Sequence, residues 1–135
     1  MILGTKNTGL RNIFESLQNV TCYDFVAQEE MGELLSLCDV AITRAGTTSL
    51  EEQKLFGLKM VIIPIPWTHD QLKNAEYYVT HHHDILVKQD DSFLLHFPMA
   101  IEKIVHHKKN WTKENLETSI RYAKEIICKE MFMRG

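Results

Sequence analysis

The sequence predicts an α/β fold, a doubly wound parallel sheet with helices on both faces. Two observations support this prediction. Apolar runs rich in β-branched residues alternate along the chain with stretches in which apolar residues recur every three or four positions. The segments between consecutive runs are long enough to hold a crossover helix, which parallel strands require. A length of 135 residues suits one core, so residues 1–135 are expected to form a single domain.

The first half of the chain shows both periodicities. Leu10, Ile13, Phe14 and Leu17, for example, have the spacing of one helix face. The predicted elements are the end of a strand at residues 1–3, a turn at 4–7, a helix at 8–17, a strand at 20–25, a helix around 31–38 and a strand at 40–43. Because the chain begins in mid-strand, we expect it to be the downstream part of a longer protein or half of a two-chain assembly.

The second half continues the alternation. The near-continuous apolar run at residues 59–64 is typical of a strand covered on both faces, and Gly57 before it is a suitable helix end. The predicted elements are a helix ending at Gly57, a strand at 59–64, a stiff loop at 64–67, a helix at 70–79, a strand at 84–87, a helix at 93–106 and a last helix at 112–133. An alternative start for the helix at 93–106 is Pro98, because proline is tolerated in a first turn.

One strand-to-helix junction carries the clearest functional pattern. It lies in the segment Asp39-Val-Ala-Ile-Thr-Arg-Ala-Gly-Thr-Thr-Ser-Leu-Glu-Glu. A tight turn at Gly46 is followed by two overlapping capping boxes, Thr48 with Glu51 and Ser49 with Glu52. Free backbone N–H groups and the positive end of the helix dipole meet at such a helix start. The junction is therefore predicted to bind an anion, at the strand end where parallel sheets bind their ligands.

Composition and charge exclude several classes of function. The net charge of −3 provides no positive field that would attract nucleic acid. No apolar run reaches the roughly 18 residues that cross a bilayer, and the N-terminus lacks a signal-peptide pattern, so a cytoplasmic protein is expected. Cys22, Cys38 and Cys128 are scattered along the chain, a usage that predicts neither disulfides nor a zinc site.

Two histidine-rich segments are interpreted as solvated helix ends. Three adjacent histidines, His81–His83, cannot converge on one metal ion from a regular helix. The basic segment His106–Lys109 also suits the end of a helix, where positive charge is favourable. Contact with an anionic membrane surface is the alternative for this second segment. No metal site is predicted.

Three segments, taken in order and with their spacing, resemble one family. They are Asp39–Glu52, Phe56–Pro64 and His69–Ala75. Together they resemble the C-terminal, nucleotide-sugar-binding domain of the MurG-type glycosyltransferases of glycosyltransferase family 28. These GT-B enzymes transfer N-acetylglucosamine from its UDP donor onto lipid I, which gives lipid II for peptidoglycan. The resemblance covers nearly the whole chain and implies a Rossmann-like half of a GT-B fold.

The resemblance implies that the anion at the junction is the diphosphate of the nucleotide-sugar. Gly46, Thr47, Thr48 and Ser49 match the segment that cradles this group. Glu52 matches the carboxylate that binds the ribose hydroxyls, and two adjacent hydroxyls suit a bidentate acceptor. The donor substrate is then UDP-N-acetylglucosamine, and no cofactor is expected.

The resemblance also implies contacts to the two ends of the donor. Gln71 and Asn74, three apart and so on one helix face, match the amides that read the sugar hydroxyls. Phe25 and Val26 match the place where backbone groups pair with the uracil edge. Met31 lies where the family often has an apolar residue over the base, but an insertion after Val26 separates it from that position.

Several of these residues also have an ordinary structural interpretation. Glu52 could only cap its helix through Ser49, and Gly46 could only serve the turn. Gln71 and Asn74 could face solvent like most surface amides. Arg44 suits either neutralisation of a phosphate or a structural role at the sheet edge, and Asp70 is expected to be an N-cap rather than an acid or base.

The departures from the family pattern limit the expected activity. The first strand-helix unit of the family domain, with its Gly-Gly-Ser loop, has no counterpart here, and neither has the acceptor-binding N-terminal domain. GT-B chemistry occurs between two domains, so the chain alone is expected to bind donor weakly and to transfer nothing. No catalytic residue is predicted, because the general base of the family belongs to the missing domain.

Three functional hypotheses follow. The first is the donor-binding part of an inverting, metal-independent N-acetylglucosaminyltransferase that acts on a polyprenyl-linked acceptor, in the cytoplasm or peripherally at the inner face of the plasma membrane. The second is a nucleotide-sugar-binding subunit that needs a separate partner chain, similar to the two-subunit enzyme of the dolichol pathway. The third is a sugar-nucleotide hydrolase or epimerase, for which the sequence offers no convincing water-activating residue.

Overall fold

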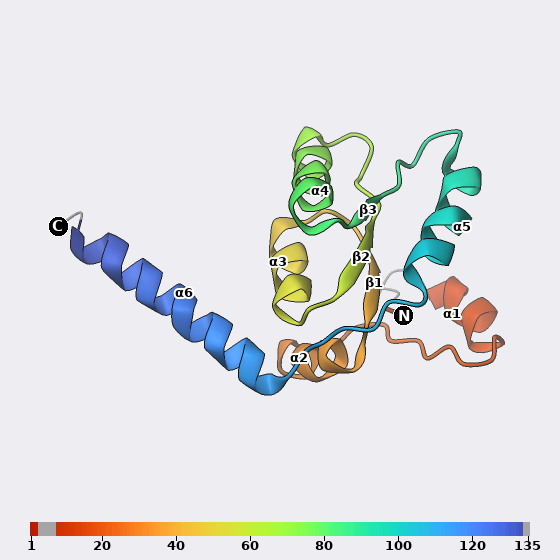
Figure 1. Cartoon of the computed structure of the whole chain (residues 1–135). Coiled ribbons are helices and arrows are strands. Elements are labelled where there is room, and N and C mark those ends of the chain that lie inside the picture. Colours follow the sequence, from red (N-terminus) through yellow and green to blue (C-terminus); the bar gives the residue numbers. More distant parts are fainter. Residues whose placement is uncertain (3–7, 134–135) are drawn as a thin grey trace. The chain divides into compact units, whose positions relative to one another are not determined.

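The computed structural model of the chain describes residues 1–2 and 8–133 (Figure 1). The chain divides into two compact units, Met1–Leu34 and Leu35–Gly135. The second unit holds the junction predicted to bind an anion, together with the elements around it. The turn predicted at residues 4–7 lies outside the described residues.

The first unit contains α1 (Thr8–Glu15) and most of α2 (Gln28–Leu37). The strand predicted at 20–25 is reduced to one parallel bridge between Tyr23 and Ile2, with a hydrogen bond of 2.8 Å from the Tyr23 N–H to the Met1 carbonyl. The strand prediction is therefore wrong in extent, since among residues 20–25 only Tyr23 takes part in a bridge. Elsewhere in the unit, Arg11 forms an ion pair of 2.8 Å with Asp24.

The sheet of the second unit is parallel. Among the described residues it has three strands in the order β1 (Val40–Thr43), β2 (Lys59–Ile62) and β3 (Ile85–Leu86). Both connections between neighbouring strands contain a helix, as the sequence predicts. Every residue of β2 after Lys59 is buried, which confirms that its apolar run is covered on both faces.

Helices cover both faces of this sheet, so the doubly wound fold class is confirmed. α3 (Thr47–Leu55) and α4 (His69–His82) pack on one face, and α5 (Phe93–Ile104) packs on the other (Figure 1). The α3/α4 face buries Ala45, Leu50, Met60, Ile62, Ala75 and Tyr78. The α5 face buries Val61, Val87, Ala100 and Ile104. The last helix is α6 (Lys113–Met133), and none of the described helices combines the length and apolar character that crossing a membrane requires.

Two helix starts, those of α3 and α4, differ from the predicted ones, whereas α5 begins at the predicted residue and not at the alternative, Pro98. The N-cap of α3 is Gly46, so Thr48 and Ser49 lie inside the helix and neither capping box forms. The N-cap of α4 is Thr68, which places Asp70 in the first turn instead of at the N-cap. α5 begins at Phe93 and contains Pro98 in its second turn.

Two sets of ion pairs and hydrogen bonds stabilise the end of the sheet at which the strands begin. The Lys54 Nζ on α3 lies 2.8 Å and 2.7 Å from the two carboxylate oxygens of Asp84, which also accepts the Met60 N–H at 2.8 Å. The Asp39 carboxylate accepts the Lys109 N–H at 3.1 Å and contacts the Lys108 ammonium at 3.3 Å. These contacts, the backbone bond first, hold the pKa of Asp39 below its ordinary value.

Candidate functional site

The start of α3 presents unpaired backbone donors at the carboxyl end of β1. The first helical hydrogen bond is donated by the Leu50 N–H to the Gly46 carbonyl, at 3.0 Å. The N–H groups of Thr47, Thr48 and Ser49 therefore have no partner within the helix, and no side chain caps them. Together with the helix dipole they form a site suited to an oxyanion. The free N–H groups predicted at this junction are thus present, although the caps are not, and binding of an anion there stays a prediction.

Gly46 is not required by the backbone. Its φ of −71° and ψ of 129° are open to any residue. The expectation of a tight turn that needs glycine is therefore wrong at this position. A Cβ placed on Gly46 would meet no atom within 4 Å, so it would project into open space in front of the helix. The absence of a side chain keeps that space clear for a ligand approaching the N–H groups.

Gln71 and Asn74 on α4 both contact the loop that precedes α3. The Gln71 Oε1 accepts the N–H groups of Ala45 at 3.2 Å and of Ile65 at 3.0 Å. The Asn74 Nδ2 donates to the Ala45 carbonyl at 3.0 Å and to the Thr47 Oγ1 at 3.2 Å. The two amides predicted to read sugar hydroxyls therefore lie beside the diphosphate-binding segment. Each also has a structural contact that the sequence does not predict.

The two adjacent glutamates of α3 have different surroundings. The Glu51 carboxylate accepts a short hydrogen bond from the Tyr78 hydroxyl of α4. Burial, and secondly this bond, raises the pKa of Tyr78. The Glu52 side chain is half-buried and has no hydrogen bond or ion pair within the described part of the chain. Because neither glutamate caps the helix, Glu52 remains available to a ligand.

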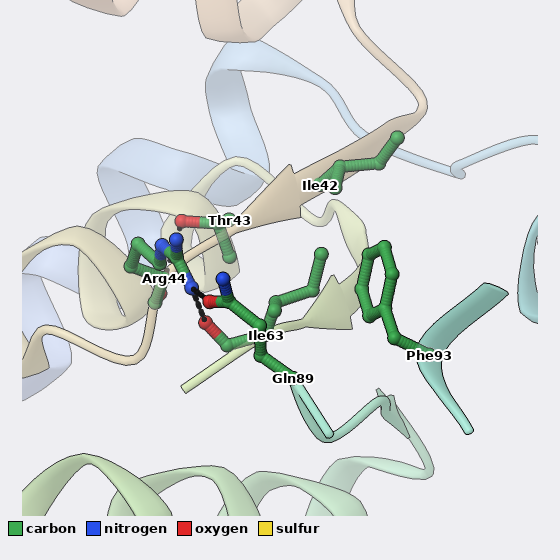
Figure 2. A pocket seen from close by; sticks show the side chains of 6 residues that line it. All are labelled: Ile42, Thr43, Arg44, Ile63, Gln89 and Phe93. Carbon is green, nitrogen blue, oxygen red and sulfur yellow. Dashed lines mark hydrogen bonds between the residues drawn. The ribbon is translucent and has the colours of Figure 1, made fainter. Parts of the chain in front are cut away.

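Arg44 lies beside a small pocket at the carboxyl ends of β1 and β2. Its Nη1 donates to the Ile63 carbonyl at 3.2 Å and to the Gln89 Oε1 at 2.8 Å (Figure 2). The pocket has a volume of about 250 Å³ and is lined by Ile42, Thr43, Arg44, Ile63, Gln89 and Phe93. Of the two interpretations of Arg44, the structural one is observed, since the guanidinium ties β2 to the segment after β3. Contact with a phosphate remains a prediction.

The residues predicted to contact the base belong to the first unit. Phe25 and Val26 follow the bridge at Tyr23 and precede α2, in irregular backbone. Phe25 is largely exposed and Val26 is buried, whereas Met31 on α2 is half-buried. Pairing of the backbone of Phe25 and Val26 with a base stays a prediction.

The histidine run forms the end of α4. The His81 Nδ1 is 2.8 Å from the Tyr77 carbonyl, and the two rings stack with centroids 4.1 Å apart. His83 is the C-cap in a left-handed conformation. Within the described residues no group of three or more His, Cys, Asp or Glu side chains could hold a metal ion. The run therefore ends a helix, as the sequence predicts.

Sequence reasoning does not identify two side chains that shape the site. Gln89 holds Arg44, and Tyr78 holds Glu51, which separates the roles of the adjacent glutamates. Gln89 lies three residues after β3, at the same edge of the sheet as the junction, so a search of all strand ends could have found it. Nothing in the sequence points to the bond between Tyr78 and Glu51.

A family model matches most of the chain. The model of the glycosyltransferase family 28 C-terminal domain matches residues 4–129. This range includes both units and every residue predicted to bind the donor. No solved structure matches the chain.

Curated relatives share a single name. They are called UDP-N-acetylglucosamine--N-acetylmuramyl-(pentapeptide) pyrophosphoryl-undecaprenol N-acetylglucosamine transferase. The protein from Desulfotalea psychrophila is 33% identical over 79 residues, which cover 57% of this chain and 21% of the relative. The protein from Sulfurihydrogenibium is 33% identical over 63 residues, 47% of this chain and 17% of the relative. The protein from Treponema denticola is 31% identical over 72 residues, 51% of this chain and 18% of the relative. The chain thus spans about a fifth of the length of the relatives it matches.

Proposed function

The chain belongs to the family of glycosyltransferase family 28 C-terminal domains, and we propose that it binds the nucleotide-sugar donor of an N-acetylglucosaminyltransferase. The donor is UDP-N-acetylglucosamine, and the acceptor is a polyprenyl-linked sugar of peptidoglycan synthesis, as the names of the relatives suggest. The observation that carries the proposal is the uncapped start of α3, where three backbone N–H groups have no partner within the helix and a Cβ on Gly46 would meet no atom within 4 Å.

The proposed binding mode distributes the donor along the strand ends. The N–H groups at the start of α3 bind the diphosphate, and Glu52, one turn further along, accepts from the ribose hydroxyls. The contacts to the uracil that the resemblance implies, at Phe25, Val26 and Met31, lie in the first unit and stay predictions. The sugar lies toward α4, where Gln71 and Asn74 reach its hydroxyls.

The carboxamide orientations support the proposed sugar contact. The Gln71 oxygen is held by two backbone N–H groups, so its Nε2 donors are the group left for a ligand. The Asn74 nitrogen is held by the Ala45 carbonyl and the Thr47 hydroxyl, so its Oδ1 acceptor is left. A sugar hydroxyl can both accept and donate a hydrogen bond, so the Gln71 Nε2 donor and the Asn74 Oδ1 acceptor together match it.

The proposed reaction is a direct displacement with inversion. The oxygen of an acceptor hydroxyl attacks the anomeric carbon, and the bond from that carbon to the diphosphate oxygen breaks. UDP leaves with the bonding electron pair, and the proton passes to a base outside this chain. The contribution of the chain is electrostatic, because the start of α3 stabilises the charge that grows on the departing diphosphate. This role places the chain in the cytoplasm, peripheral to the membrane that holds the acceptor.

Titration with UDP-N-acetylglucosamine tests the proposal. We expect the wild-type chain to bind it, and Glu52→Ala to bind it roughly 1–3 kcal/mol more weakly, because two charge-assisted hydrogen bonds to the ribose are lost. Glu76→Ala is the matched control, since Glu76 is an exposed residue of α4. A wild-type chain that does not bind the nucleotide-sugar would overturn the proposal. Equal affinity of wild type and Glu52→Ala would remove Glu52 from the site.

The donor-binding role suits two arrangements of the complete enzyme. In one, the acceptor-binding part belongs to the same polypeptide; in the other, it is a separate partner chain. In both, the base and the site that binds the acceptor belong to the acceptor-binding part. Restoration of transfer by a separately added acceptor-binding chain would favour the second arrangement.

A further inference from the structure

The side-chain amides of Gln71 and Asn74 form a clamp on the loop before α3. The Ala45 backbone is held on both sides, because its N–H donates to Gln71 at 3.2 Å and its carbonyl accepts from Asn74 at 3.0 Å. Ala45 itself is fully buried. A residue held through both of its backbone polar groups has little freedom to move relative to α4.

The same clamp joins two loops at the strand ends. The Gln71 Oε1 accepts from Ala45, in the loop after β1, and from Ile65, in the loop after β2. The Asn74 Nδ2 extends the clamp to the Thr47 hydroxyl, at the first residue of α3. The orientation of both amides is fixed by their partners, since only an oxygen can accept two N–H groups and only a nitrogen can donate to a carbonyl.

We infer that Gln71 and Asn74 are positioning residues for the diphosphate, in addition to any contact they make with the sugar. This inference rests on the proposed function. The N–H groups that would bind the diphosphate begin at Thr47, two residues after the clamped Ala45. Holding Ala45 and Thr47 against α4 fixes where these donors point before the ligand arrives. Donors that are held in place in advance bind an anion without the cost of ordering the loop.

The inference differs from a role in sugar recognition alone. If the two amides only contact the sugar, their removal weakens binding of UDP-N-acetylglucosamine and leaves binding of UDP unchanged. If they also position the loop, binding of UDP weakens as well, although UDP carries no sugar at the anomeric position. The comparison of the two ligands therefore separates the two roles.

The first experiment needs no ligand. Amide hydrogen exchange of Ala45 and Ile65 is followed by NMR in the wild-type chain, in Gln71→Leu and in Gln71→Glu. Gln71→Leu removes the acceptor, so both amides should exchange roughly 3- to 10-fold faster. Gln71→Glu keeps an acceptor oxygen of the same reach and should retain the protection. Unchanged exchange in Gln71→Leu would overturn the clamp.

The second experiment compares UDP with UDP-N-acetylglucosamine by calorimetric titration. Asn74→Ala is expected to weaken binding of UDP roughly 3- to 10-fold and binding of UDP-N-acetylglucosamine at least as much. Lys73→Ala is the matched control, because Lys73 is the exposed neighbour on the same helix. Thermal unfolding of each variant establishes that it is folded.

The outcomes separate this inference from the proposed function. If wild type binds both ligands and Asn74→Ala loses affinity only for the nucleotide-sugar, the positioning role is wrong and the donor-binding function stands. If the wild-type chain binds neither ligand, the donor-binding function itself is wrong. Loss of UDP affinity in Asn74→Ala, with Lys73→Ala unchanged, supports the positioning role.

Discussion

At the scale of single residues, the fold does not require a glycine at position 46, whereas the proposed ligand does. Its backbone conformation is available to every residue, and the space in front of it is open. Neither the turn nor the packing needs a glycine there. A side chain would enter the space that a diphosphate must occupy to reach the N–H groups of Thr47 and Thr48.

Gly46→Ala is therefore expected to affect binding and not stability. Urea unfolding should give a free energy within about 0.5 kcal/mol of wild type, because the conformation suits alanine. Affinity for UDP should fall at least about tenfold, because the added methyl group displaces the ligand. Gly9→Ala is the control, since a Cβ at Gly9 also meets no atom within 4 Å. A large loss of stability in Gly46→Ala would show that the fold needs this glycine after all.

Asp39 gives the second prediction at this scale, a dependence of stability on pH. Its pKa in the folded chain is below the ordinary 3.8, through the Lys109 N–H and then Lys108. A lowered folded pKa adds stability above the ordinary pKa, and this stability is lost as the pH falls through the folded value. Unfolding by urea at pH 6 and in the acid range should show that the free energy of unfolding falls less on acidification in Asp39→Asn than in wild type.

Asp91→Asn is the control for that measurement. Asp91 is exposed and has no hydrogen bond or ion pair within the described residues, so its removal should leave the fall in the free energy of unfolding on acidification as in wild type. If the free energy of unfolding falls equally on acidification in Asp39→Asn and in wild type, the contacts of Asp39 with the segment before α6 do not contribute to stability.

At the scale of elements, the pair between Lys54 and Asp84 connects α3 to the start of β3. The Asp84 side chain is completely buried and the Lys54 side chain is 18% exposed. The carboxylate also accepts the Met60 N–H, so one aspartate binds α3 and β2 at once. The position of α3, and with it the position of the proposed anion site, depends on this contact at its far end.

Lys54→Met is expected to lower the free energy of unfolding by about 3 kcal/mol, because it leaves a buried carboxylate without its countercharge. Chemical unfolding at neutral pH measures this loss. Lys59→Met is the control: the Lys59 Nζ donates only to the His82 carbonyl, at an exposed position, so its removal should cost about 1 kcal/mol or less. Equal losses in the two variants would contradict a special contribution of the buried pair.

At the scale of the whole molecule, the proposed donor site accounts for only part of what a glycosyl transfer requires. The family model covers residues 4–129, whereas the chain spans about a fifth of the curated relatives. In a GT-B enzyme the reaction takes place between the donor-binding and acceptor-binding parts. Under the proposed function, the base belongs to the acceptor-binding part, and the start of α3 contributes only the donor contacts.

We accordingly predict that the isolated chain binds UDP-N-acetylglucosamine and transfers nothing. Incubation with labelled donor and a polyprenyl-diphosphate-linked acceptor should yield no labelled lipid, and no hydrolysis of the donor above the uncatalysed rate. In the positive control, the acceptor-binding domain of a relative, produced without its donor-binding domain, is added to the chain, and labelled lipid is expected. Transfer by the isolated chain would show that the base lies within these residues. Hydrolysis by the isolated chain would favour the sugar-nucleotide hydrolase.

The sequence predicts the second unit better than the first. The strand at residues 40–43 is observed as predicted, the strand predicted at 59–64 is observed at 59–62, and helices occur between the strands as predicted, because apolar periodicity reflects burial. The strand at 20–25 is reduced to a single bridge at Tyr23, because pairing depends on a partner far away in the sequence. Short-range signals at helix starts, such as the capping boxes at Thr48 and Ser49, are equally unreliable when packing shifts a boundary.

The sequence by itself determined the fold class and the family, and it predicts an anion site at the start of α3. These follow from periodicity and from motifs that are contiguous in the chain. Only the tertiary structure decided which polar groups bond to each other. Glu51 bonds to Tyr78 and Arg44 to Gln89. Gln71 and Asn74 both bond to the backbone of Ala45. The partners in these pairs are between 26 and 45 positions apart, and which donor meets which acceptor depends on how the helices pack on the sheet.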